Sequence, residues 1–232
     1  MLQELLTIFR SKSPLQNMAA RFEEMLSLSL EMIRKAGNLY FSESITPEER
    51  TALQKQDVRV NKLQRKIRKQ VIVHLSMPGN QTDLPYCLLL MSLVKDVERI
   101  GDYAKELADL VNLCEGPLPD DQLLAELKEI RAGVESDYEG SVKVLQTADR
   151  ESAIGLIQCG RDTIDRCDQL VENLAYSDYK PCTVTNMVLA VRFYGRIAGH
   201  TLNLLSSVVM PLHKLDYYDE KDIAKAEKKL QR

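Results

Sequence analysis

Residues 94–111 read VKDVERIGDYAKELADLV, and residues 191–209 read VRFYGRIAGHTLNLLSSVV, a second copy of the same helical phrase. Placed over each other, the two copies align Arg99 with Arg196 and the isoleucine that follows each of them. A phrase that recurs at this separation predicts an architecture in which one structural unit is built twice.

The two copies differ in their carboxylates. The first copy carries Glu98 and Asp102, whereas the aligned positions of the second copy are Gly195 and Gly199. The acidic chemistry of the repeat is therefore expected in the first half of the chain only.

Six long segments around these phrases place apolar residues at alternating steps of three and four. In the third segment the series begins Leu90, Leu93, Val97, Ile100. This spacing is typical of one buried helix face and not of a strand. The sequence predicts an all-α fold of six long helices arranged as two three-helix repeats. The predicted helices cover residues 14–42, 47–76, 84–113, 119–146, 150–176 and 183–210.

Helix-start and loop signals divide the chain. Thr46-Pro47-Glu48-Glu49 has the residues of a capping box, and the proline-containing stretches 77–85 and 115–119 read as loops. We expect four parts: a lead-in at 1–13, repeat one at 14–113, repeat two at 119–213, and a charged C-terminal tail at 214–232.

Composition narrows the class of protein. The 232 residues are 44% hydrophobic with no Trp, which suits a helical core of aliphatic side chains, and the net charge of −3 argues against nucleic-acid binding. The apolar runs are too short for a membrane span, and the N-terminus has too little apolar length for a signal peptide. We expect a cytoplasmic protein that can dock on the inner face of a membrane.

The chain has five cysteines, an odd number, and no CxxC pair. Because disulfides form mainly in oxidising compartments, we expect reduced thiols throughout. The cysteines are Cys87, Cys114, Cys159, Cys167 and Cys182.

A group of oxygen-bearing side chains is predicted in repeat one. Glu98 and Asp102 are four residues apart and share one helix face, as do Asp57 and Asn61 on the preceding helix. In an antiparallel hairpin centred in the loop at 77–85, Asn61 lies opposite Glu98, and Asp57 lies opposite Asp102. Three carboxylates and a carboxamide suit one divalent or trivalent ion such as Mg²⁺, Mn²⁺, iron or Zn²⁺. The alternative is an ordinary solvated helix face.

The same construction in repeat two places Asp165 opposite Gly195 and Arg161 opposite Gly199. One carboxylate beside a cation is a poor metal site. We therefore expect repeat two to bind no metal, with Arg161 in the space that a metal would fill.

Enzyme motifs are not recognisable in the sequence. None of His74, His200 and His213 follows a glutamate by three residues, and there is no HExxH, GxSxG or phosphate-cradling glycine loop. His200 is interpreted as a helix-packing residue. A metal-dependent hydrolase remains the alternative if the site at Glu98 keeps an open coordination position.

The second predicted helix carries a run of six basic residues without an acid. A solvated face is the simpler interpretation, and an acidic partner or an anionic membrane is the alternative. The run consists of Arg59, Lys62, Arg65, Lys66, Arg68 and Lys69.

These phrases resemble the PhoU family. VKDVERIGDYAKELADL looks like the signature helix of that family, and RxxxRIAxHTxNL, from residue 192, is similar to its second repeat without the acids. QKQDVRVNKLQRKI, residues 54–67, resembles the family's D-x-x-V-N helix. The resemblance covers roughly residues 14–213.

The resemblance implies a non-enzymatic, cytoplasmic negative regulator of phosphate uptake and of phosphate-starvation signalling. Such proteins form homodimers and act by contacting a phosphate transporter and a sensor histidine kinase. Relatives also pair with sodium–phosphate cotransporters, which leaves that partner as an alternative.

The resemblance also implies surface metal sites built on an E(D)xxxD motif in each repeat. Glu98 and Asp102 match the motif, with Asp57 and Asn61 on the neighbouring helix, whereas residues 195–199 depart from it. One metal site, in repeat one, is therefore expected.

Overall fold

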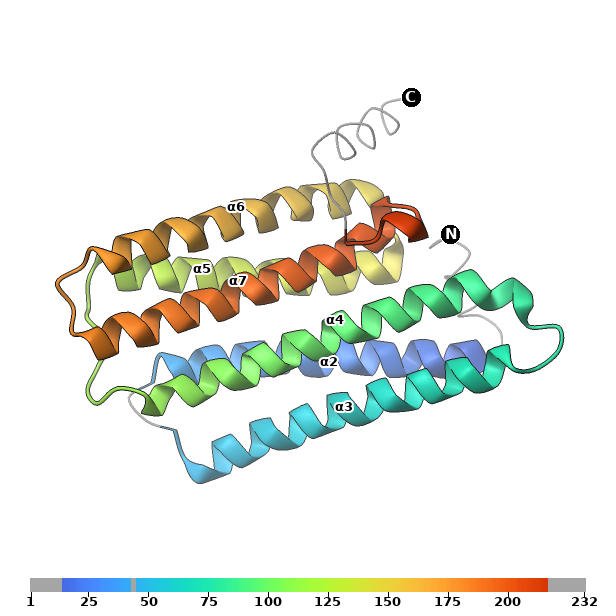
Figure 1. Cartoon of the computed structure of the whole chain (residues 1–232), viewed down its shortest axis with the longest axis horizontal. Coiled ribbons are helices and arrows are strands. Elements are labelled where there is room, and N and C mark those ends of the chain that lie inside the picture. The colour runs from blue at the N-terminus through green and yellow to red at the C-terminus, as the bar shows by residue number, and fades with distance from the viewer. Residues whose placement is uncertain (1–13, 43–44, 217–232) are drawn as a thin grey trace.

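The computed structural model describes residues 14–42 and 45–216, and within them every regular element is helical (Figure 1). The predicted all-α fold with two sets of three long helices is confirmed. The lead-in at 1–13 and most of the charged tail lie outside the described residues. The long helices are α2 (Pro14–Tyr40), α3 (Pro47–Leu75), α4 (Leu84–Asp109), α5 (Gln122–Thr147), α6 (Arg150–Ala175) and α7 (Pro181–Val209).

Side-chain caps set several helix starts. Thr46 and Glu49 form the predicted capping box of α3, with reciprocal side-chain to backbone hydrogen bonds. α5 begins later than the predicted residue 119 because Asp121 caps it and accepts hydrogen bonds from the next backbone amides. Asp149 caps α6 in the same way.

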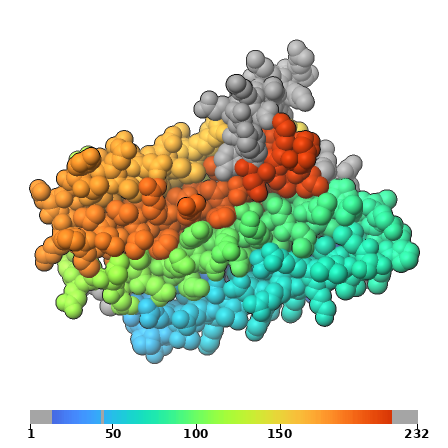
Figure 2. Space-filling model, viewed as in Figure 1, coloured from blue at the N-terminus to red at the C-terminus, as the bar shows by residue number. Residues whose placement is uncertain are grey.

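The helices form two three-helix bundles that lie side by side. α3, α4, α7 and α6 follow one another across one face of the molecule, with α2 and α5 behind them (Figure 1). The same face appears in Figure 2 as continuous bands from α3 through α4 to α7 and α6. One hydrophobic core runs from Leu15 to Leu204 through both bundles, so the bundles share an interior.

α4 and α7 carry the two copies of the repeated phrase, and they pack against each other across the join between the bundles. Asp96 Oδ1 lies 2.7 Å from His200 Nδ1, and the rings of Tyr103 and Phe193 lie 6.0 Å apart. Asp96 aligns with Phe193, and Tyr103 aligns with His200. Equivalent positions therefore make reciprocal contacts, as in a two-fold symmetric interface.

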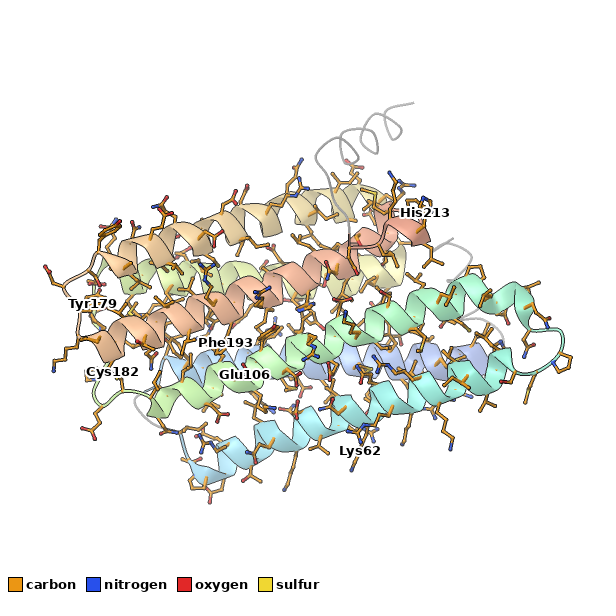
Figure 3. All side chains as sticks on the ribbon, viewed as in Figure 1. Lys62, Glu106, Tyr179, Cys182, Phe193 and His213 are labelled. Atoms are coloured by element: carbon orange, nitrogen blue, oxygen red, sulfur yellow. A yellow bond between two sulfur atoms is a disulfide. The ribbon has the colours of Figure 1, made fainter. Side chains whose placement is uncertain are left out.

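The expectation that all cysteines are reduced thiols is wrong for one pair. Cys114, which follows α4, and Cys182, at the start of α7, form a disulfide with Cα atoms 5.9 Å apart. The pairing arises because the end of α4 and the start of α7 meet at one end of the molecule, where Figure 3 labels Cys182. Sequence separation alone gives no sign of that proximity.

The described helices give no candidate for a bilayer-spanning segment, because none of them combines sufficient length with sufficient apolarity.

Candidate functional site

The predicted pairing between α3 and α4 is confirmed by an ion pair. Arg50 Nη2 lies 2.9 Å from Asp109 Oδ1. Arg50 is seven residues before Asp57, and Asp109 is seven residues after Asp102, so the pair belongs to the register in which Asp57 faces Asp102. The predicted hairpin geometry is therefore correct in repeat one.

The pairing in repeat two is confirmed in the same way. Arg192 Nη1 lies 2.6 Å from Asp168 Oδ1. Arg192 is three residues before Gly195, and Asp168 is three residues after Asp165. The two hairpins thus share one construction, and they differ in the side chains that it brings together.

The structure brings the four residues predicted for the metal site to one place between α3 and α4. We call Asp57, Asn61, Glu98 and Asp102 the acidic cluster. Their side chains are partly buried, with Asp57 13%, Glu98 18% and Asp102 24% exposed. The cluster lies outside the hydrophobic core.

The carboxylates of the acidic cluster repel one another. Burial raises the pKa of Glu98, the charges of Asp102 and Asp57 raise it further, and Arg99 and Arg68 lower it. Burial also raises the pKa of Asp57, which Lys105 and Asn61 lower and Asp102 raises. The upward direction means that the neighbouring cations do not fully offset the loss of hydration that burial imposes on the ionised carboxylates.

Two cations contact the acidic cluster directly. Lys105 Nζ lies 3.8 Å from Asp57 Oδ2, and Arg99 lies 3.3 Å from Asp102 and 3.7 Å from Glu98. Among the described residues, no three His, Cys, Asp or Glu side chains converge closely enough to hold a metal ion. The four predicted residues are neighbours but not a closed ligand set.

The donor chemistry of the acidic cluster nevertheless fits a hard cation. Carboxylate and carboxamide oxygens are the ligands that Mg²⁺, Mn²⁺ and similar ions take. Burial is the largest cause of the raised pKa of both Asp57 and Glu98, so an ionised carboxylate at either position is less stable here than in water. A cation bound to these oxygens would stabilise the ionised form of both groups.

Repeat two places two other arginines beside its glycines. The groove beside Gly195 and Gly199 is lined by Arg192 and Arg196 of α7, and Arg161 is not among its lining residues. The sequence prediction missed these two arginines because it considered only the residues opposite the glycines.

His200 has the predicted packing role, with its ring stacked on Tyr103 at 5.8 Å between centroids. It also bonds to Asp96, a 4% exposed carboxylate that the sequence prediction missed. The sequence did contain a signal for this residue. Asp96 aligns with Phe193, an aromatic residue of the kind usually buried, so an acid at this position is expected to have a partner inside the protein.

His74 is also structural. It is buried at the tip of the α3–α4 hairpin, where its ring nitrogens meet Asp83 at 2.7 Å and Asn80 at 3.3 Å. These contacts fasten the hairpin loop to the end of α3.

Comparison with known proteins agrees with the resemblance. A model of the PhoU domain matches residues 22–111. No curated protein matches the sequence significantly. The structure is similar to that of PhoU from Pseudomonas aeruginosa, with a TM-score of 0.76 and 21% identity over 86% of this chain and 97% of that one.

The structure is also similar to that of the phosphate transport system regulatory protein PhoU from Streptococcus pneumoniae. That match has a TM-score of 0.75 and 18% identity over 94% of this chain and 100% of that one. At these identities the likeness shows a shared fold. Residues 22–111 therefore match the PhoU domain, and the structure as a whole has the fold of PhoU proteins.

Proposed function

We propose that this chain is a negative regulator of phosphate uptake and phosphate-starvation signalling that acts through protein–protein contact. The observation that carries the proposal is the PhoU domain at residues 22–111, set in a fold shared with a phosphate transport system regulatory protein. In this role the chain works as a cytoplasmic homodimer without catalysis. Its partners are a phosphate transporter at the inner face of the membrane and a sensor histidine kinase.

The acidic cluster is the proposed metal site of this regulator. The carboxylates of Asp57, Glu98 and Asp102 and the amide oxygen of Asn61 would hold one hard cation. A bound cation supplies positive charge and joins α3 to α4. The support is the partial burial and the raised pKa of Asp57 and Glu98. A bound cation would lower both pKa values.

The regulatory role is tested by deleting the gene in the source organism and measuring phosphate uptake in phosphate-rich and phosphate-poor medium. We expect uptake in rich medium to stay high in the deletion strain and to fall when the wild-type gene is restored. Uptake equal to wild type in both media would contradict the proposal.

The partner is tested with the same strains. Uptake is measured with sodium replaced by potassium in the medium. If the derepressed uptake disappears without sodium, the regulated partner is a sodium–phosphate cotransporter. If it persists, the partner is a transporter of another type.

A further inference from the structure

A groove lies between α6 and α7. Its cavity volume is about 490 Å³, within the range of roughly 300–1,000 Å³ that is usual for small-molecule sites. α6 contributes Ile164, Cys167 and Asp168, and the rest of the lining comes from α7. The α7 residues are Val191, Arg192, Gly195, Arg196, Gly199, His200 and Asn203.

Two glycines of α7 keep this groove open. Gly195 and Gly199 are the counterparts of Glu98 and Asp102, and they lie one turn apart on one face. A Cβ atom added at Gly199 would meet nothing within 4 Å, and one at Gly195 would meet Cys167 at an ordinary 3.6 Å. Each interior helical glycine costs roughly 1 kcal/mol relative to alanine. Because packing does not require them, their effect is to leave the groove empty.

The polar lining of the groove favours an anion. Arg196 forms no ion pair with any described residue and is exposed beside the two glycines. Arg192 is paired with Asp168, the one carboxylate in the lining, at 2.6 Å. This pair is more than half exposed, so it is weakly held and Arg192 is free to turn toward a ligand.

The floor of the groove adds no negative charge. Cys167 is buried, and burial raises the pKa of its thiol to about 12, so the sulfur stays protonated. Ile164 and Val191 complete an apolar floor. An organic body attached to an anionic group would have a surface to pack against.

One end of the groove is held in place by a buried acid. Asp96 of α4 accepts hydrogen bonds from His200 at 2.7 Å and from Asn203 at 2.9 Å. Both side chains are therefore fixed before any ligand arrives, which lowers the entropic cost of binding.

From these observations we infer that the α6–α7 groove binds a phosphate group, either as free phosphate or on a small organic molecule. Arg196 and Arg192 are its main contacts, because the planar guanidinium matches two phosphate oxygens at once. The inference rests on the groove and its charges and does not depend on the proposed regulatory role. Repeat one and repeat two thus use the same hairpin position for ligands of opposite charge.

The test is isothermal titration calorimetry of the full chain with three probes: inorganic phosphate, AMP and adenosine. We expect binding of phosphate or AMP and none of adenosine. AMP binding about tenfold or more tighter than phosphate would identify an organic phosphate as the source, since the apolar floor then adds affinity. Comparable affinities would identify free phosphate. Binding of neither probe, or equal binding of adenosine, would overturn the inference.

Variants locate the site. Arg196→Ala should weaken binding about tenfold or more, because a charge-assisted contact is lost. Gly199→Glu should abolish binding by filling the groove and supplying a competing carboxylate. Arg196→Lys should retain part of the affinity.

The matched control is Gly155→Glu on α6. Gly155 is exposed, a Cβ added there would meet nothing within 4 Å, and it does not line the groove. This variant makes the same chemical change and should bind as wild type. If Arg196→Ala and Gly199→Glu both keep wild-type affinity with unchanged circular dichroism, the phosphate is bound elsewhere and the inference is wrong.

Discussion

Tyr103 and His200 occupy the same position in the two copies of the repeated phrase, and their rings stack with centroids 5.8 Å apart. Around them, equivalent positions of the two copies make the contacts between α4 and α7, but the types of side chain differ. On one side His200 meets the carboxylate of Asp96, and on the other Tyr103 meets the ring of Phe193. One half of the join is therefore polar and the other half aromatic.

Asp96→Ala should destabilise the protein strongly. Asp96 is 4% exposed and accepts hydrogen bonds from His200 and Asn203, which would be left without their acceptor. We expect a loss of about 3 kcal/mol in the free energy of unfolding, measured by urea denaturation. The control is Asp168→Ala, which removes an exposed ion pair and should cost under about 1 kcal/mol. Equal losses of unfolding free energy in the two variants would contradict the assignment of Asp96 as a buried, stabilising hydrogen-bond acceptor.

Replacing Glu98 and Asp102 together by Ala should remove bound metal, measured by mass spectrometry of the purified protein's metal content. Asp165→Ala is the control, since this exposed carboxylate of repeat two has no acidic partners facing it on α7. The fold should survive both changes because the residues lie outside the core. Wild-type metal content in the double variant would show that the metal, if any, is bound elsewhere.

Lys105→Met should tighten metal binding. The ammonium of Lys105, 3.8 Å from Asp57, occupies the electrostatic role that a cation would take, so its removal leaves the acidic cluster more negative. We expect about a tenfold gain in affinity for Mn²⁺, measured by calorimetry. Lys62→Met, on the exposed side of α3, removes the same charge without that contact and should change the affinity little. Unchanged or weaker binding in Lys105→Met would mean that the lysine does not compete with the metal.

Asp137 should make stability depend on pH. Burial raises the pKa of this carboxyl from 3.8 to about 6 in the folded protein. Well below pH 3.8 the group is protonated in both the folded and the unfolded state and costs nothing. Its stability penalty develops as the pH rises from 3.8 to about 6 and is constant above that. Because the Asp137 side chain is only about half buried, solvent screening reduces this penalty well below its full linkage value. Asp137→Asn should therefore stabilise the protein at pH 7.5 by about 1 kcal/mol and have little effect at pH 3.5, measured by urea denaturation. A gain of the same size at both pH values would exclude ionisation as its cause.

The Cys114–Cys182 disulfide should leave three free thiols of the five cysteines, counted by thiol titration of the unreduced, unfolded protein. The bond closes a loop with a sequence separation of 68 residues. By the chain-entropy model, its reduction should lower the free energy of unfolding by roughly 4 kcal/mol. Cys159→Ser, which changes an exposed cysteine outside the bond, should leave both the loop and the stability unchanged. A count of five thiols would contradict the pairing.

The fold was predictable because its determinants are local. Helix periodicity and caps such as the Thr46–Glu49 box appear in the sequence, and the loop centre of each hairpin fixes which residues face each other. The Arg50–Asp109 and Arg192–Asp168 ion pairs obey the registers derived in this way. The same hairpin register predicted that Asp57 and Asn61 of α3 lie beside Asp102 and Glu98 of α4 in the acidic cluster.

Contacts between the hairpins were not predictable in this way. The bond from Asp96 to His200 and the disulfide from Cys114 to Cys182 depend on how α4 lies against α7, which no loop length fixes. The groove depends on the absence of side chains at Gly195 and Gly199. Its cations, Arg192 and Arg196, lie on the same helix as the glycines, whereas the hairpin register considers only residues on the opposite helix. Such features need the three-dimensional arrangement.

The acidic cluster lies between α3 and α4, the arginine-lined groove lies between α6 and α7, and α4 and α7 run side by side between the two places (Figure 1). The helices around these two places do not extend the local charge, because α3 and α4 together carry more Lys and Arg than Asp and Glu, and α6 and α7 carry equal numbers of the two kinds. Attraction of an ion to either place is therefore short-ranged. It acts only once the ion is close to the carboxylates of the acidic cluster or to the guanidinium groups of the groove.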